Sequence, residues 1–106
     1  MLDFSNSKIL IGGDVMLDKY YFGKVDRISP EAPVPIVNIQ KEESRLGGAS
    51  NVANNIVSLG GHSLLCGVIG HDLFGKEIER ISRHKNIDTF LLKTSSPTIT
   101  KARIIG

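Results

Sequence analysis

The stretch that decides the fold is GGASNVANNIVSLGGHSLLCGVI, residues 47–69. Between its two glycine pairs, apolar residues recur at helical spacing: Val52, Ala53, Ile56, Val57 and Leu59. The second pair, Gly60-Gly61, is a typical signal for the C-terminal end of a helix. The apolar run from Ser63 to Ile69 then predicts a buried strand. A helix that leads directly into a strand is the repeating unit of α/β proteins.

The same alternation continues in both directions along the chain. Before this stretch, residues 8–14 form an apolar run that ends in a glycine turn, which predicts a strand. After it, Asp72 can cap a second helix, and further strands are predicted over residues 87–93 and 98–105. We therefore predict an α/β fold with a mostly parallel sheet, flanked by helices that cover both of its faces.

Residues 19–45 interrupt this alternation. Aromatic and β-branched positions over residues 19–29 predict an exposed antiparallel strand, and the prolines of residues 29–35 require an extended loop. A second strand starts at Val34 and fades into the charged stretch of residues 41–45. We expect these strands to lie outside the central sheet as an inserted β lid, formed by about residues 19–45 and 97–106.

Composition limits the classes of protein to consider. With 106 residues, of which 41% are hydrophobic, the chain suits one small folded domain, residues 1–106, and not a disordered segment. Its net charge of +2 is dispersed, so we expect no nucleic-acid partner, and no apolar run approaches the about 20 residues of a membrane span. A single cysteine and a polar N-terminus predict a cytoplasmic protein without disulfides. The three histidines lack metal-ligand spacing, so we predict no metal site.

Two glycines and an asparagine form the first candidate binding site. Gly47 and Gly48 let a ligand approach the backbone, and the following helix N-terminus supplies free N–H groups. The amide of Asn51, in the first helical turn, could reach a ligand hydroxyl. The alternative is that the glycines only make a sharp loop. No Gly-Lys-Ser/Thr follows, so the motif is not a P-loop.

Asp14 and Asp18 are the candidate carboxylates. Asp14 follows the first predicted strand directly, and ligands of open α/β sheets bind outside the carboxyl ends of the strands. A carboxylate in that place could accept hydrogen bonds from two sugar hydroxyls, and Asp18 could share the site. Turn formation or helix capping is the alternative for both residues.

Lys101 and Arg103 alternate on the last predicted strand, so their side chains share one face. Two cations on one face would suit a phosphate group. The alternative is that these charges protect an exposed sheet edge from aggregation.

Taken together, the motifs resemble those of the ribokinase-like (PfkB) sugar kinases. The resemblance rests on residues 47–53, with Gly60 and Gly70 at their later positions, and on the turn Gly70-His71-Asp72-Leu73-Phe74-Gly75. Residues 13–20 and 27–35 resemble the heptose 7-phosphate kinase branch more narrowly. Leu46 and Ser50 depart from the usual proline and alanine.

The resemblance implies phosphorylation of D-glycero-β-D-manno-heptose 7-phosphate at its anomeric hydroxyl by Mg-ATP, within ADP-heptose synthesis for lipopolysaccharide. It implies that Asp14, Gly47, Gly48 and Asn51 contact sugar hydroxyls and that the lid strands pair in a homodimer. The family's catalytic Asp lies in a late Gly-Ala-Gly-Asp turn that this sequence lacks. We therefore expect an N-terminal fragment that has no catalytic residue, no ATP or Mg²⁺ site, and no kinase activity alone.

Two other functions stay open at this point. One is a kinase of the same family with a different substrate, such as another sugar or a nucleoside. The other is a non-catalytic module that binds sugar or mediates dimerisation.

Overall fold

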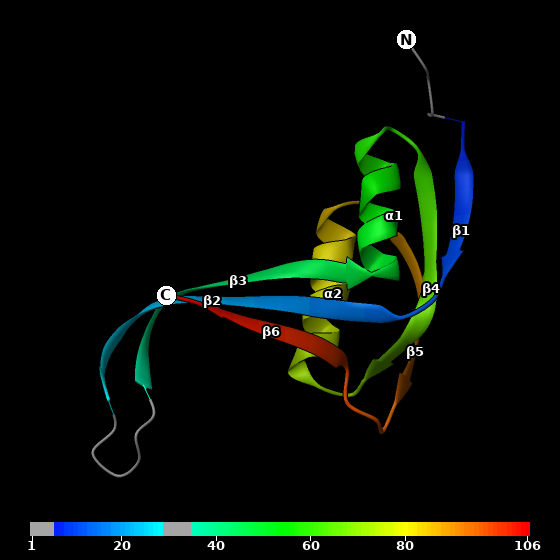
Figure 1. Cartoon of the computed structure of the whole chain (residues 1–106). Helices are drawn as coiled ribbons and strands as arrows, with labels where there is room; N and C mark the ends of the chain where they lie inside the picture. Colours follow the sequence, from blue (N-terminus) through cyan, green and yellow to red (C-terminus); the bar gives the residue numbers. More distant parts are fainter. Residues whose placement is uncertain (1–5, 29–34) are drawn as a thin grey trace.

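The computed structural model describes residues 6–28 and 35–106, and Figure 1 shows their arrangement. Two three-stranded sheets share the chain, with strand orders β1-β4-β5 and β3-β2-β6. The elements follow one another as β1 (Lys8–Gly12), β2 (Val15–Ile28), β3 (Pro35–Gly48), α1 (Ala49–Ser58), β4 (His62–Gly70), α2 (Leu73–His84), β5 (Asp88–Thr94) and β6 (Ile99–Ile105). In these described ranges, no helix has both the length and the apolar character needed to cross a membrane.

The first sheet is the predicted parallel sheet. Strands β1, β4 and β5 all run parallel, and β4 lies in the centre. Helices α1 and α2 lie together on one side of it (Figure 1). Between the helices and the sheet, Ile11, Leu65 and Ile69 pack with Ala53 and Ile78 in one apolar core. The prediction of an α/β fold built on a parallel sheet is therefore confirmed.

Helices cover only one face of this sheet in the described chain, whereas its apolar runs alone favour a sheet covered on both faces. Leu10, Leu64, Val68, Phe90 and Leu92 project from the opposite face and are exposed, Leu10 by 69% and Phe90 by 66%. Neighbouring side chains of a strand point to opposite faces, so Leu65 is fully buried while Leu64 is open. An apolar run predicts a buried strand, but it does not say how many of its faces the same stretch of chain covers.

The second sheet joins β2 antiparallel to β3 and parallel to β6. Strand β2 starts at Val15, four residues before the predicted start, because Val15 and Leu17 alternate into the core and are almost completely buried. Strand β3 does not fade at the charged stretch but continues through it to Gly48. The predicted proline loop falls mostly on residues 29–34, which lie outside the described residues.

The charged part of β3 remains a strand because β2 lies beside it, and its charged side chains find partners on the strand surface. Glu43 lies between two cations of its own strand, with Lys41 Nζ at 3.0 Å and Arg45 Nη2 at 2.8 Å. The hydrogen bond from Arg45, and then that from Lys41, lowers the pKa of the Glu43 carboxyl. Both cations also contact aromatic rings of β2: Arg45 lies over the ring of Tyr20, and Lys41 lies over the ring of Phe22. These side chains alternate onto one face and satisfy one another there.

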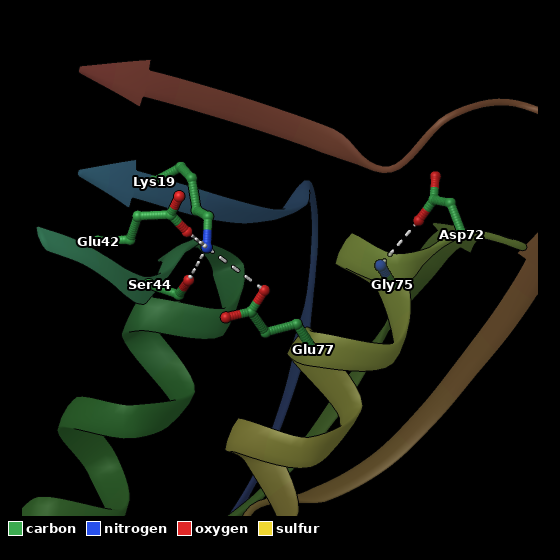
Figure 2. A network of polar contacts seen from close by, with 6 residues as sticks. All are labelled: Lys19, Glu42, Ser44, Asp72, Gly75 and Glu77. Atoms are coloured by element: carbon green, nitrogen blue, oxygen red, sulfur yellow. Dashed lines mark hydrogen bonds and ion pairs between the residues drawn. The ribbon is translucent and has the colours of Figure 1, made fainter. Parts of the chain in front are cut away.

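Lys19 ties the second sheet to helix α2 (Figure 2). Its side chain is mostly buried, and its ammonium donates to Ser44 Oγ at 2.8 Å. Carboxylate oxygens of Glu42 and Glu77 lie 3.6 and 3.7 Å from the same nitrogen. The ring of Phe74, also on α2, has its centroid 6.0 Å away. A buried ammonium needs such partners, and here they come from both layers.

The two helices differ in how well their apolar patterns predict burial. In α2, Asp72 is the N-cap as predicted, and Ile78 and Ile81 are buried. In α1, Ala53 is buried, but Val52 and Leu59 of the predicted apolar face are exposed. The α1 face is narrower than predicted because these helices and the sheet form only two layers.

Candidate functional site

The candidate site lies where the chain passes between the two sheets. Asp14 stands between β1 and β2, and Gly48 stands between β3 and α1. The main-chain oxygen of Asp14 accepts a hydrogen bond from Ala49 N at 2.8 Å. Gly48 has a φ of +56°, and a Cβ atom there would collide with the same oxygen. Glycine is thus required at position 48 for both conformation and space.

Asp18 lies against the other glycine of the pair. A Cβ atom at Gly47 would come within 2.9 Å of both carboxylate oxygens of Asp18. The missing side chain of Gly47 is therefore the space that this carboxylate occupies. The structure brings Asp18 together with the glycine pair, whereas Asp14 reaches the pair through its main chain only.

Helix α1 begins at this point with no side-chain cap. Its N-cap is Gly48, and its first turn contains no acidic residue. Ser50 is fully buried, and its hydroxyl donates to the main-chain oxygen of Gly47, with the main-chain oxygen of Met16 3.2 Å away, so the start of the helix is fixed against β2 and β3. Asn51 follows and is exposed. Its amide is thus available to a ligand, whereas the N–H of Ala49, the first residue of the helix, is already bonded to the Asp14 oxygen.

Two cavities adjoin the junction and divide the predicted residues between them. The larger, about 470 Å³, is lined by Asp18 and Asn51 together with Tyr20, Arg45 and Asn54. The smaller, about 230 Å³, is lined by Asp14 and by the ends of β4 and β5. Asp14 lies at the carboxyl end of the parallel sheet, as its position directly after β1 predicted. Asp14 and Asn51, expected to share one site, line different cavities.

Lys101 and Arg103 lie on β6, which pairs with the part of β2 that carries Asp18. Lys101 is paired with Asp18 and Arg103 with Tyr20, and paired residues of neighbouring strands point to the same face. Neither cation lines the two cavities. Strand β6 is an edge of its sheet, where exposed charged side chains counter pairing with other chains.

This face of the second sheet is rich in positive charge. Four cations (Lys41, Arg45, Lys101 and Arg103) and two carboxylates (Asp18 and Glu43) follow the same alternation, which gives 4 − 2 = +2. Lys41 and Arg45 already pair with Glu43, but in the described chain no ion pair involves Lys101 or Arg103.

The sequence interpretation missed Tyr20, Arg45 and Asn54 as lining residues. The signal for Tyr20 and Arg45 was present, because alternation from Asp18 and Gly47 leads to them along the two strands. For Asn54 the signal was its place three residues after Asn51, on the same side of α1. The signal for Tyr20 and Arg45 also depends on pairing β2 with β3, which requires the strand register.

The described residues do not suit a resident metal ion. Across residues 6–28 and 35–106, no three His, Cys, Asp or Glu side chains gather closely enough to hold one.

Comparison with known proteins agrees with the fold and adds the family. Residues 6–106 match the family described as pfkB family carbohydrate kinase. A D-beta-D-heptose 7-phosphate kinase of Bordetella bronchiseptica is 50% identical over 103 residues, which are 96% of this chain and 33% of that protein. The bifunctional protein HldE of Actinobacillus pleuropneumoniae (serotype 5b) is 50% identical over 104 residues, 97% of this chain and 22% of that protein. The chain thus spans between about a fifth and a third of the length of these relatives.

Solved structures show the same fold at low sequence identity. A carbohydrate kinase from Agrobacterium tumefaciens aligns with a TM-score of 0.72 and 21% identity over 92% of this chain and 31% of its own. The phosphofructokinase-2 from Escherichia coli, in complex with fructose-6-phosphate, aligns with a TM-score of 0.69 and 19% identity over 92% of this chain and 30% of its own. The arrangement of the two sheets is thus that of ribokinase-like proteins. With a family match over almost its whole length and a shared fold, this chain belongs to the pfkB family of carbohydrate kinases.

Proposed function

We propose that this chain is the sugar-phosphate-binding part of an ATP-dependent heptose 7-phosphate kinase. The observation that carries the proposal is the Asp18 carboxylate, which lies against Gly47 and is flanked by Lys101 on the next strand. One face thereby offers an acceptor for sugar hydroxyls and a cation for a phosphate. The substrate class is supported by the 50% identity to a heptose 7-phosphate kinase.

The sugar ring would be held by Asp18, Asn51 and the first turn of α1. A carboxylate can accept hydrogen bonds from two neighbouring hydroxyls, and an amide can both donate and accept. The bare backbone at Gly47 and Gly48 allows the ring to approach the N–H groups of the helix closely. Asp14 is retained as a candidate, in contact with the ligand from the smaller cavity at the carboxyl end of β1.

The 7-phosphate would be held by Lys101 and Arg103. Both side chains are exposed, and they sit on the face that carries the +2 charge. Arg103 can present two N–H groups to one phosphate, whereas Lys101 acts as a point charge. A sugar that lacks the phosphate would lose these contacts and keep those of Asp18 and Asn51.

In the complete reaction, the anomeric hydroxyl oxygen would attack the γ-phosphorus of ATP. The new O–P bond forms as the bond to ADP breaks, and the hydroxyl proton passes to a base. This sequence holds no Gly-Ala-Gly-Asp turn, so other parts of the kinase would supply the base and the binding sites for ATP and Mg²⁺. The described residues would orient the acceptor sugar, and the β3-β2-β6 sheet would act as a lid that excludes water. The same lid strands are the proposed contact between two copies in a homodimer.

Kinetics of the complete kinase test the proposal. We expect Asp18→Asn to lower kcat/KM for heptose 7-phosphate about ten- to a hundredfold, as for the loss of a hydrogen bond to a charged group, with little change in the KM for ATP. The matched control is Asp88→Asn, an exposed carboxylate at the start of β5, which should leave both constants unchanged. Unchanged sugar kinetics in Asp18→Asn would overturn the assigned role.

A different sugar is the second candidate substrate, because low-identity structural neighbours include kinases named for fructose and ribose. Parallel assays with fructose 6-phosphate and ribose decide between them. Higher kcat/KM for either sugar than for heptose 7-phosphate would move the assignment to that sugar, while the family would stand.

A further inference from the structure

The turn Gly70-His71-Asp72-Leu73-Phe74-Gly75 has so far only the role of starting helix α2. Its N-cap, Asp72, accepts a hydrogen bond from Gly75 N at 2.8 Å through Oδ1 (Figure 2). A helix cap needs no more than this one bond. The second carboxylate oxygen, Oδ2, is directed elsewhere.

That oxygen binds the start of β6. Thr98 N donates to Asp72 Oδ2 at 2.8 Å, and the Thr98 hydroxyl donates to Asp72 Oδ1 at 2.6 Å. The hydroxyl oxygen in turn accepts from Gly70 N at 2.9 Å. Thr98 is only 6% exposed, so water cannot easily replace these bonds. Four hydrogen bonds thus link the end of β4, the start of α2 and the residue immediately before β6.

The two glycines of the turn leave room for this network. A Cβ atom at Gly70 would come within 2.6 Å of Asp72 Oδ2 and 2.8 Å of Thr98 N. At Gly75 it would lie 3.0 Å from the Thr98 hydroxyl oxygen. Main-chain oxygens also leave no room for a side chain at these glycines, since Ser96 O and Gly70 O lie 2.5 Å from the Cβ positions of Gly70 and Gly75 respectively.

This network fixes the connection from β5 of the first sheet to β6 of the second sheet, and it does so through side-chain hydrogen bonds. At the start of α1, Ala49 N donates to the main-chain oxygen of Asp14, and the Ser50 hydroxyl contacts the main chain of β2 and β3. Just before β6, by contrast, the Asp72 carboxylate accepts hydrogen bonds from both the backbone N–H and the side-chain hydroxyl of Thr98. Lys101 and Arg103 follow Thr98 by three and five residues on the same strand.

We propose that Asp72 and Thr98 are positioning residues, a clamp that holds β6 so that Lys101 and Arg103 face the substrate phosphate. The inference rests on the proposed function, because it takes the two cations as phosphate ligands. The clamp itself touches no substrate. It acts by fixing where β6 begins against the parallel sheet, and hence where its cations lie relative to Asp18.

The test is Thr98→Val in the complete kinase, compared with Thr100→Val. Valine keeps the shape of threonine but removes the hydroxyl. Thr100 lies on the same strand, and its hydroxyl donates only to Thr98 O, so it is the matched control. We expect Thr98→Val to raise the KM for heptose 7-phosphate about five- to tenfold, in the range of coupled neighbouring sites. The KM for unphosphorylated heptose and that for ATP should not change, and Thr98→Ser should restore wild-type values.

A double-mutant cycle separates the clamp from the phosphate site. In a Lys101→Gln/Arg103→Gln background, Thr98→Val should have no further effect on the KM for heptose 7-phosphate. An equal effect of Thr98→Val on both sugars, or one that persists in that background, would overturn the clamp and leave the proposed function intact. If the double substitution leaves the preference for the phosphorylated sugar unchanged, the phosphate ligands are wrong and the clamp proposal falls with them.

Thermal midpoints accompany each variant, because the loss of Thr98 also weakens the fold. Should Thr98→Val fail to fold, Asp72→Asn is the second variant. Its amide oxygen can still accept from Gly75 N, but its NH₂ group would face Thr98 N. The same selective rise in KM for the phosphorylated sugar is expected, and its absence in a folded Asp72→Asn enzyme would refute the clamp.

Discussion

The two sheets of this molecule are stabilised by different kinds of interaction. The parallel sheet depends on apolar side chains packed beneath α1 and α2, such as Leu65 and Ile69. The second sheet contributes Val15 and Leu17 of β2 and Leu46 of β3 to that core, and further out it depends on charged and aromatic pairs such as Arg45 with Tyr20. Apolar packing fixes geometry tightly, whereas exposed ion pairs contribute little to stability. The parallel sheet is thus suited to be the rigid base, and the second sheet to be the adjustable part.

The site lies where these two regions meet, and it takes something from each. The helix N-terminus and Asn51 belong to the rigid base, whereas Asp18 belongs to the second sheet close to its anchored end. Substitutions in the two regions should therefore differ in how strongly they destabilise the protein.

Leu65→Ala tests whether packing carries the parallel sheet. Leu65 is fully buried, and removal of its side chain should destabilise the protein by about 2–5 kcal/mol. The neighbouring Leu64, 39% exposed on the uncovered face, is the matched control, and Leu64→Ala should have a clearly smaller effect. Urea unfolding followed by circular dichroism measures both. Equal losses would mean that the uncovered face is packed in solution.

Gly48→Ala tests the junction between the sheets. A methyl group at this residue would collide with the main-chain oxygen of Asp14, and the φ of +56° is itself unfavourable for alanine. We therefore expect the free energy of unfolding to fall by about 1–3 kcal/mol, as for other strained backbone positions. Gly12→Ala is the control, because a Cβ atom there meets nothing within 4 Å. The same unfolding experiment applies. A neutral Gly48→Ala would show that the junction can rearrange freely.

The acid sensitivity of the clamp is the third test. Hydrogen bonds from Thr98, and then that from Gly75, hold the pKa of the Asp72 carboxyl below its usual 3.8. Because the pKa is lower in the folded state, the stabilisation is present above the unfolded-state pKa and is lost as the pH falls through the folded-state value. His71, when protonated, acts in the same direction.

The thermal midpoint, followed from about pH 6 to about pH 2, measures this loss. Wild-type protein should lose more stability over that range than Asp72→Asn, and the two should converge at the acid end. Thr98→Val should also show a shallower loss, because it removes the first cause of the shift. Parallel curves for wild type and Asp72→Asn would contradict the hydrogen-bonding pattern.

Glu77→Gln tests the ionic link between the layers and should have the smallest effect. The Glu77 carboxylate lies 3.7 Å from Lys19 Nζ and is a quarter exposed, so we expect a loss of no more than about 1 kcal/mol, reduced by added salt. Glu42→Gln, at the more exposed partner of the same lysine, should have even less effect. A loss of several kcal/mol would mean that the second sheet is anchored by charge rather than by Leu17 and Val15.

Local patterns predicted the parallel sheet, both helices and the cap at Asp72, because each depends on residues within about one element. They failed where a distant partner decides the outcome. Strand β3 continues through its charged residues because β2 lies beside it, and Val52 is exposed because the described chain has no third layer to cover it. For the candidate site, local sequence predicted the glycine pair and Asn51, but the closeness of Asp18 to Gly47 depends on the antiparallel register.

The sequence by itself determined the fold class, since alternating apolar runs and glycine stops encode helices and strands within short windows. It also determined the family, since the glycine and aspartate spacings are long enough to be specific. Only the tertiary structure decided which carboxylate lies against the glycine pair, which face of the parallel sheet stays open, and that Asp72 binds Thr98 as well as its own helix. These outcomes depend on pairing between residues about 25 or more positions apart, and the pairing is set by packing of the whole chain rather than by any local pattern.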